Sequence, residues 1–353
     1  MTPIPVVIIT GFLGAGKTTL LNALLRDPQF ANSAVLINEF GDTQIDHDLV
    51  AEFSDAFIMT TTGCLCCTAS SDLKRSLFDL WMRHKDGKIG AFSRVIVETT
   101  GLADPVPVLK ALLAPPTSSV LDRTVAQQFA LARVITLFDV ITGGATLNAH
   151  PEAEKQLALA DAIVLTKTDL AHDPATRSDI ADECERLRDI NPAAALLDRA
   201  HDWARLRGII QSPATYDLRG KGEDALAWLQ AEAHSSHHHH HEHADVNRHG
   251  HDIRTHCIIL DKPITSPALS FFTHALKLFA GSDLLRVKGL VALADNPDRP
   301  VVIHGVQHLI HPIDQLERWP SEDRRTRIVL IGRDLNINTL RAALRYAADG
   351  PRA

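Results

Sequence analysis

The sequence Gly11-Phe12-Leu13-Gly14-Ala15-Gly16-Lys17-Thr18 decides how this chain folds. The apolar run Pro5–Thr10 precedes it and predicts a buried strand, and the leucine-rich segment Thr19–Leu25 follows it and predicts a helix. Between them stands the pattern G-x-x-x-x-G-K-[ST], the phosphate-binding P-loop, in the strand–loop–helix context that it requires. A chance glycine-rich turn with one lysine is the alternative, but here every position and both flanks fit. The sequence therefore predicts a site for a nucleoside triphosphate.

Each part of the P-loop has a chemical role toward phosphate. Glycines let the backbone wrap around the anion, and the amide N–H groups at the start of the helix point at it. The Lys17 ammonium is expected to reach the β- and γ-phosphates, and the Thr18 hydroxyl to ligate Mg²⁺. The predicted nucleotide-binding residues of this segment are Gly11, Gly14, Ala15, Gly16, Lys17, Thr18 and Thr19.

Composition limits what else the chain does. Its 353 residues suggest two domains, and a hydrophobic content of 45% is enough for a sizeable core. A formal net charge of −7 without a dense basic stripe argues against nucleic acid as a partner. No apolar run reaches the ~20 residues of a membrane span, and no secretory signal is recognisable. We therefore expect a cytoplasmic protein that contacts no membrane.

Apolar strands alternate with helices in the first part of the chain. After the strand that leads into the P-loop, further strands are predicted at Ala34–Asn38, Val95–Glu98, Val134–Asp139, Ala162–Thr166 and Ala193–Leu197. Continuous apolar strands of this kind form a mostly parallel sheet with helices on both faces, an α/β fold. Ligands bind at the carboxyl ends of such strands, so residues that directly follow a strand are expected to gather on one rim.

The pattern changes near the C-terminus. Strands are predicted at Ile253–Leu260, Leu284–Ala294, Pro300–Leu309 and Arg327–Ile331, and helices at Ser266–Phe279 and Ile337–Tyr346. Strands in succession with two helices predict a smaller α+β domain with an antiparallel sheet. The expected organisation is a P-loop NTPase domain over 1–222, a helix and His-rich linker over 223–252, and the α+β domain over 253–353.

Two further segments are predicted to complete the nucleotide site. Glu98 ends an apolar strand and Gly101 follows, as in a Walker B and switch II segment, so the Glu98 carboxylate is expected to hold Mg²⁺ directly or through water. The Gly101 amide would follow the γ-phosphate and move when it leaves. Lys17, Thr18 and Glu98 are therefore the expected catalytic residues.

The segment Thr166-Lys167-Thr168-Asp169 resembles the guanine-reading sequence N-K-x-D. Asp169 would accept hydrogen bonds from guanine N1 and N2, and the Lys167 stem would lie on the ring. Thr166 stands where Asn is usual, so one element of base recognition is altered. Read alone, the segment is also an ordinary strand-to-helix turn. In its context it favours GTP over ATP, with Thr166, Lys167 and Asp169 as nucleotide-binding candidates.

Three cysteines within four residues, Cys64, Cys66 and Cys67, indicate a metal site. Thiolates hold Zn²⁺ tetrahedrally at about 2.3 Å. These three converge only if the chain turns, because in an extended strand Cys67 would point away from the others. Small buried hydrophobes or a redox-active pair are the alternatives, although no C-x-x-C spacing is present. Glu39, a histidine or a partner protein would supply the fourth ligand.

Histidine is unusually abundant, with 19 residues, nine of them between 234 and 251. This low-complexity segment is interpreted as a linker that holds borderline metals through imidazole. A solvated spacer or an expression tag is the plain alternative, and the internal position and broken pattern argue against a tag. The candidate ligands are His237, His238, His239, His240 and His241. The isolated Cys184 and Cys257 are expected in the core.

Together these residues resemble the CobW-like family of P-loop GTPases, the metallochaperone relatives of the urease and hydrogenase maturation GTPases. The resemblance covers nearly the whole chain. It rests on Gly11–Thr18, Asn38–Gly41, Gly63–Cys67, Glu98–Pro105, Thr166–Asp169, Leu285–Gly289, Gly305–His308 and Arg333-Asp334. It implies GTP hydrolysis with Mg²⁺, coupled to binding a transition metal and delivering it to a client metalloprotein. The metal is most often zinc, with cobalt in the cobalamin branch.

Nucleotide state would control metal release, because the cysteines lie between the two segments expected to sense the γ-phosphate, Asn38–Asp42 and Glu98–Asp104. No catalytic glutamine or arginine finger is assignable, so slow intrinsic turnover is expected. A small-molecule kinase, which would leave the cysteines without function, and a non-catalytic His-rich metal store or sensor stay open as other functions. The client, zinc versus cobalt, and assembly into a homo-oligomer also stay open.

Overall fold

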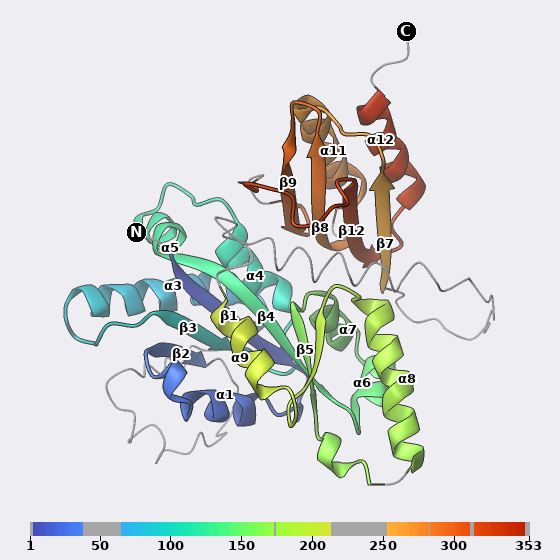
Figure 1. Cartoon of the computed structure of the whole chain (residues 1–353). Coiled ribbons are helices and arrows are strands. Elements are labelled where there is room, and N and C mark those ends of the chain that lie inside the picture. Colours follow the sequence, from blue (N-terminus) through green and yellow to red (C-terminus); the bar gives the residue numbers. More distant parts are fainter. Residues whose placement is uncertain are drawn as a thin grey trace. The chain divides into compact units, whose positions relative to one another are not determined.

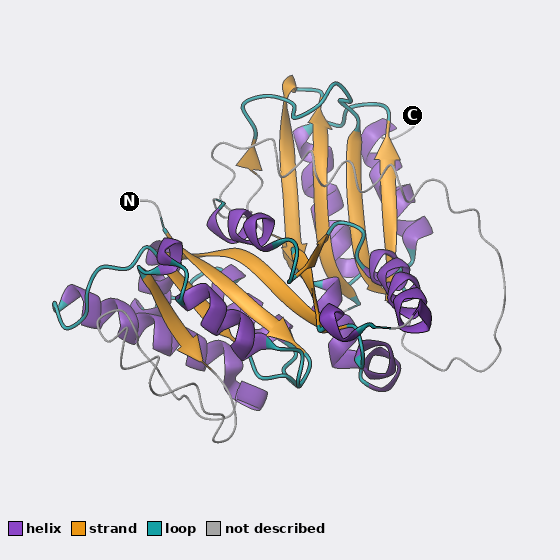
Figure 2. Ribbon diagram, turned by 60° about the horizontal axis from the view of Figure 1, so that its bottom comes forward, coloured by secondary structure: helices purple, strands orange, loops and turns teal. Residues whose placement is uncertain are grey.

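The computed structural model describes residues 3–37, 65–172, 174–212, 253–281, 283–310 and 314–349 (Figure 1). The chain forms two compact units. The first consists of Met1–Glu183 and Ala195–Asp217, and the second of Cys184–Ala194 and Leu218–Ala353. Each unit contains a sheet with helices packed on it (Figure 2). Among the described residues, no helix is both long and apolar enough to cross a membrane.

The described part of the first unit contains a six-stranded sheet in which every pairing is parallel. In spatial order its strands are β2 (Ser33–Ile37), β3 (Arg94–Glu98), β1 (Ile4–Gly11), β4 (Phe129–Asp139), β5 (Ala162–Thr166) and β6 (Ala195–Asp198). Strand β1 therefore lies in the interior of the sheet, with Ile9 opposite Glu98 and Gly11 opposite Leu137. This arrangement confirms the predicted parallel α/β fold and puts the end of β1 in the middle of the rim.

Helices cover the sheet on both faces. In the described chain they are α1 (Lys17–Leu25), α3 (Leu65–Lys85), α4 (Pro105–Leu113), α5 (Val120–Gln128), α6 (Gly143–Ala149), α7 (Pro151–Ala158) and α9 (Trp203–Gln211), with 3-10 turns η1 (Pro28–Phe30) and η2 (Thr168–Leu170). Helix α8 (Pro174–Ile190) is divided between the two units, because the second unit begins at Cys184. Val7 and Ile9 pack with α1 and α9 in one core. Val6 and Ile8 are equally buried and point to the opposite face, because side chains alternate along a strand. Helix α3 packs against α4 and α5.

The second unit has an antiparallel sheet. Its described strands run in the order β10 (Leu309–Ile310), β9 (Asn296–Val306), β8 (Leu284–Leu293), β12 (Thr326–Arg333) and β7 (Ile253–Leu260), and β11 (Asp314–Gln315) also pairs with β9. Helices α11 (Ser266–Phe279) and α12 (Ile337–Asp349) pack against each other. Val287, Ile303 and Leu330 of the sheet share one core with Phe272 and Leu344 of these helices. The predicted smaller α+β domain is confirmed.

Several elements differ from those predicted. The short elements α5, α6, α9, β10 and β11 carry no long periodic pattern and were not expected. Strand β4 begins at Phe129, five residues before the predicted start, because Phe129–Arg133 also pairs with β1. Within this stretch, the buried Arg133 donates through Nη2 to Ser212 Oγ over 2.6 Å, which compensates for burying a charge in a strand.

The prediction that Cys184 and Cys257 lie in the core was wrong, because both side chains are only partly buried. Cys257 lies on β7, the edge strand of the second sheet, and Cys184 lies on the charged helix α8. The neighbouring Ile258 faces the helices and is buried, so Cys257 points to the other face of the sheet.

Candidate functional site

The P-loop connects β1 to α1 through glycines in conformations that other residues rarely adopt. The φ angles are +141° at Gly11, +74° at Gly14 and +90° at Gly16. A Cβ atom on Gly11 would lie 2.6 Å from the Leu137 carbonyl oxygen of the neighbouring strand. Gly16 is the N-cap of α1 and supplies no side-chain cap, so the N–H groups of the first turn are left for another acceptor. Such a helix start is suited to binding an anion.

The Lys17 side chain folds back over this loop. Its ammonium donates to the carbonyl oxygens of Gly11 and Phe12 over 3.0 and 3.1 Å, and only 5% of the residue is exposed. These two hydrogen bonds hold the positive charge of Lys17 beside the N–H groups of the loop. Loop and ammonium together form a compact site for a polyanion.

Thr18 and Glu98 come together although 80 residues separate them in the sequence. Thr18 Oγ1 donates to Glu98 Oε1 over 2.8 Å, and Glu98 is completely buried at the end of β3. The pairing of β1 with β3 explains this proximity, because both strands end at the same rim. A hydroxyl oxygen and a carboxylate oxygen at this distance are a donor set that suits Mg²⁺.

The segment after β3 lies directly against the P-loop. Thr99 donates through its backbone N–H to the Ile9 carbonyl over 3.0 Å and through its hydroxyl to Thr10 Oγ1 over 2.9 Å. A Cβ atom on Gly101 would lie only 2.6 Å from the Leu13 backbone nitrogen. Only glycine fits at residue 101, because larger residues would push the two segments apart.

The segment Thr166–Asp169 lies on the same rim, at the end of β5. The Thr166 side chain is buried, and its hydroxyl donates to the Ala15 carbonyl of the P-loop over 2.9 Å and to the Phe138 carbonyl over 3.2 Å. The hydroxyl therefore fastens the P-loop to β5, and this contact gives the threonine a role that does not involve the base. Asp169 lies in η2 and is exposed.

Lys167 adopts a left-handed backbone conformation with φ +61° and forms an ion pair with Asp139, with 2.6 Å between Nζ and Oδ2. Burial raises the pKa of Asp139, but hydrogen bonds from Lys167, from Thr142 and from the Ile141 N–H outweigh it and hold the pKa below its ordinary value. The aspartate is thus an anion that fixes the lysine stem on the rim.

Sequence reasoning missed Asp139 and Asp198 as parts of the site. Asp139 ends β4 beside β5, and a carboxylate directly after an apolar strand was the signal that could have found it. Asp198 ends β6 and accepts from the Thr168 hydroxyl over 3.1 Å and from the Ala200 N–H over 2.7 Å. Both aspartates brace the Thr166–Asp169 segment.

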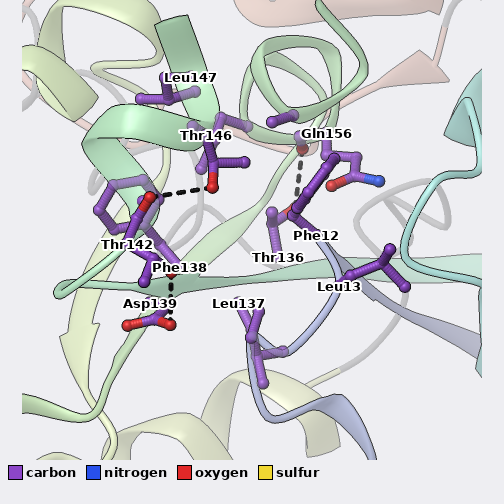
Figure 3. Close-up of a pocket in the computed structure, with 14 residues that line it drawn as sticks. Phe12, Leu13, Thr136, Leu137, Phe138, Asp139, Thr142, Thr146, Leu147 and Gln156 are labelled. Carbon is purple, nitrogen blue, oxygen red and sulfur yellow. Dashed lines mark hydrogen bonds between the residues drawn. The ribbon is translucent and has the colours of Figure 1, made fainter. Parts of the chain in front are cut away.

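A small apolar pocket of about 20 Å³ lies behind the P-loop (Figure 3). Phe12 and Leu13 line it together with the end of β4 and with helices α6 and α7. Its volume suffices for about one water molecule, so it is not the binding space of a nucleotide. The ring of Phe12 lies 4.5 Å from that of His150, the residue at the junction of α6 and α7.

Most of the predicted metal ligands lie outside the described residues. This applies to Glu39, to Cys64 and to the histidines 237–241. Cys66 and Cys67 lie in the first turn of α3. In the part of the chain that the structure describes, no group of three or more His, Cys, Asp or Glu residues could hold a metal.

Comparison with protein families identifies both units of the chain. Residues 5–198 match the family model described as CobW/HypB/UreG, nucleotide-binding domain. Residues 253–348 match the model described as Cobalamin synthesis protein cobW C-terminal domain.

Individual proteins are similar over nearly the whole chain. The zinc chaperone YjiA of Escherichia coli is 32% identical and covers 97% of this chain and 98% of its own length. The zinc chaperone CobW of Pseudomonas aeruginosa is 30% identical and covers 98% of this chain and 92% of its own length. The crystal structure of the Zn(II)-bound YjiA GTPase from E. coli aligns with a TM-score of 0.68 and 27% identity, over 98% of this chain and 99% of that one.

Proposed function

The chain belongs to the CobW/HypB/UreG family of P-loop GTPases, and from this premise we propose that it binds a transition metal at its cysteines and delivers it to a client protein under control of the bound nucleotide. One observation carries this coupling. The segment that follows Glu98 ends at Asp104, whose Oδ1 accepts from the Val106 N–H over 2.9 Å and so caps α4. Helix α4 packs on α3, and Cys66 and Cys67 lie in the first turn of α3.

In the proposed reaction the P-loop residues Gly11 to Thr19 bind the phosphates, and a water molecule attacks in line. A bond forms between the water oxygen and the γ-phosphorus, the bond from that phosphorus to the β-phosphate oxygen breaks, and one proton of the water passes to the released phosphate. The Lys17 ammonium stabilises the negative charge on the leaving oxygen. Mg²⁺, held by Thr18 and Glu98, would neutralise charge on the β- and γ-phosphates. The Gly101 amide reports whether the γ-phosphate is present.

The nucleobase in this proposal is guanine. Asp169 is exposed on the rim and accepts the hydrogen bonds of guanine N1 and N2, while the Lys167 stem, fixed by Asp139, lies along the ring. Thr166 contributes by holding the Ala15 carbonyl in place and does not itself read the base.

Zinc is the proposed metal, and cobalt is the alternative. Cys64, Cys66 and Cys67 are the proposed thiolate ligands, with Glu39 as a further ligand. The names of the relatives support zinc, since both YjiA and CobW are described as zinc chaperones. A YjiA variant in which one glutamate and two cysteines are replaced by alanine is also described as Zn(II)-bound, although it lacks those three side chains. On this ground we propose His237 to His241 as a second, weaker metal site that serves as a local reserve for the thiolates.

The organisation 1–222, 223–252 and 253–353 also remains our proposal. The His-rich linker would supply metal locally, and the C-terminal domain would dock the client.

The role of Glu98 leads to a prediction about magnesium. Replacing Glu98 by glutamine keeps an oxygen that accepts from Thr18 but removes the negative charge. We expect the Mg²⁺ concentration for half-maximal GTP hydrolysis to rise by about 10–100-fold, the range found when a group that supports a metal ion through a ligand is replaced. A magnesium titration of the GTPase rate measures this, with the exposed Glu322→Gln as control. An unchanged magnesium requirement would exclude Glu98 from the metal site.

The coupling of nucleotide and metal predicts that zinc affinity differs between nucleotide states. We expect the Zn²⁺ dissociation constant to change by about 5–150-fold between the GDP complex and the complex with a non-hydrolysable GTP analogue, the usual range of such coupling. Competition titrations with a chelating dye measure both constants, and Co²⁺ is titrated in parallel. Equal affinities in both states would refute the coupling.

The triple variant with serine at Cys64, Cys66 and Cys67 separates this proposal from its rivals. It is expected to abolish the nucleotide-dependent part of zinc binding, whereas Cys184→Ser keeps it. A small-molecule kinase would retain turnover and metal content unchanged in the triple variant. A His-rich store would lose most metal only when residues 234–251 are deleted, and Lys17→Ala would leave its metal binding unchanged.

A further inference from the structure

We propose that Gln156, assisted by Lys155, is a positioning residue for GTP hydrolysis that latches the segment Gly101–Asp104 against the P-loop. The proposal rests on the role given above to Gly101 as the sensor of γ-phosphate. Both latch residues lie on α7, far in sequence from the segment that they hold.

Gln156 is buried, and each end of it is fixed. Its side-chain amide donates from Nε2 to the carbonyl oxygens of Gly101 over 3.2 Å and Ala103 over 3.1 Å. Its own backbone carbonyl accepts from the Thr136 hydroxyl on β4 over 2.8 Å. Only 1% of the residue is exposed, so no water can replace these partners without opening the interior. The sheet therefore holds the glutamine, and the glutamine holds the segment.

The neighbouring Lys155 adds a second contact to the same segment. Its Nζ lies 2.8 Å from Asp104 Oδ2, and the two side chains are 26% and 35% exposed. An ion pair at that exposure contributes little on its own because solvent screens it. The Gln156 amide is therefore the main part of the latch, and Lys155 adds a weaker contact to Asp104 at the end of the segment.

Helix α7 also contacts the P-loop itself. His150, its N-cap residue, packs its ring against Phe12, and the backbone of the next P-loop residue, Leu13, is the close neighbour of Gly101. Figure 3 shows Gln156 next to Phe12 and Leu13 beside the pocket behind the loop. Gly101 thus lies between the P-loop and Gln156. When it moves with the γ-phosphate, it must either break the two hydrogen bonds or pull on α7.

This geometry explains why a buried position carries glutamine. An apolar side chain of the same size would fill the space without controlling the backbone of Gly101 and Ala103. An amide that loses its partners in the interior is costly, so the segment has one favoured position to which it returns. That position keeps Gly101 at the P-loop, where its N–H can meet the reacting phosphate.

Gln156→Met tests the latch, because methionine keeps the volume and cannot donate. We expect kcat for GTP to fall about tenfold, as the loss of one or two hydrogen bonds predicts. KM for GTP and the affinity for GDP should change by less than about twofold, since the P-loop itself is intact. Amide hydrogen exchange in residues 99–104 should become faster. The control is Gln211→Met, which removes an exposed hydrogen bond of 3.0 Å from Nε2 to Gln29 Oε1. It should change neither kcat nor the amide exchange of residues 99–104.

Lys155→Met serves as a second variant that leaves the interior untouched, and it should show the same changes in smaller size. The latch is refuted if Gln156→Met keeps wild-type kcat and wild-type exchange in residues 99–104. It is also refuted if KM rises as much as kcat falls, because that pattern indicates that the variant binds the nucleotide more weakly, which a latch that only positions Gly101 would not cause. If the wild-type protein exchanges these amides equally with GDP and with a GTP analogue, the sensor role of Gly101 is wrong. The change in kcat then decides the latch alone.

Discussion

Replacing Lys17 by alanine is expected to lower kcat/KM for GTP hydrolysis by about 10²–10³-fold, the loss seen when one preorganised charge-stabilising donor is removed from an active site. Lys17 is suited to this role because its buried ammonium already lies over the loop, 3.0 Å from the Gly11 carbonyl. No reorganisation is then needed as charge develops on the phosphates. Alanine leaves the loop backbone in place but takes away its positive charge.

Steady-state kinetics with GTP measures the loss in turnover, and titration with a fluorescent GDP analogue measures the loss in nucleotide affinity. Lys88→Ala is the matched control, since that lysine is 65% exposed and pairs only with Asp86 two residues away among its described contacts. Its removal should leave hydrolysis unchanged. A decrease of less than tenfold for Lys17→Ala would show that this ammonium does not stabilise the transferred phosphoryl group.

Gly11→Ala is expected to have the largest effect on stability, lowering the free energy of unfolding by about 2–6 kcal/mol and abolishing nucleotide binding. The backbone conformation, with φ +141°, costs an alanine roughly 1–3 kcal/mol. The new Cβ also lies 2.6 Å from the Leu137 carbonyl, and relieving such a clash costs roughly 1–3 kcal/mol more. Leu137 cannot move away easily, because it is the strand partner of Gly11 in the interior of the sheet.

Gly87→Ala separates these two costs. Gly87 also has a positive φ, +69°, but nothing lies within 4 Å of the position its Cβ would take. Urea denaturation should therefore show a loss of only about 1–2 kcal/mol for this control, the backbone cost alone. Equal losses in the two variants would show that β4 yields to the clash. Retention of GDP binding by Gly11→Ala would show that the P-loop still binds phosphate when the backbone at its first residue is altered.

Much of the fold was predictable, because its main signals are local. The apolar runs of β1, β3 and β5 and the glycines of the P-loop specify strands, a loop and a helix from neighbouring residues alone. The parallel order then brings Thr18, Glu98 and Thr166 to one rim. The elements that were not predicted are short ones such as α5, α6 and α9. Their stability comes from packing on the sheet, so no long periodic pattern in the sequence indicates them.

The sequence by itself determined that this chain has a P-loop at the end of a buried strand in a mostly parallel sheet, and it determined the family. Only the tertiary structure decided which side chains hold the site in place. Thr166 meets the Ala15 carbonyl across 151 residues, and Gln156 meets the Gly101 carbonyl across 55. The sequence does not show which group a threonine or a glutamine will bond to, because a hydrogen bond depends on distance and direction in the folded chain. The strands supply that geometry only after the sheet has formed.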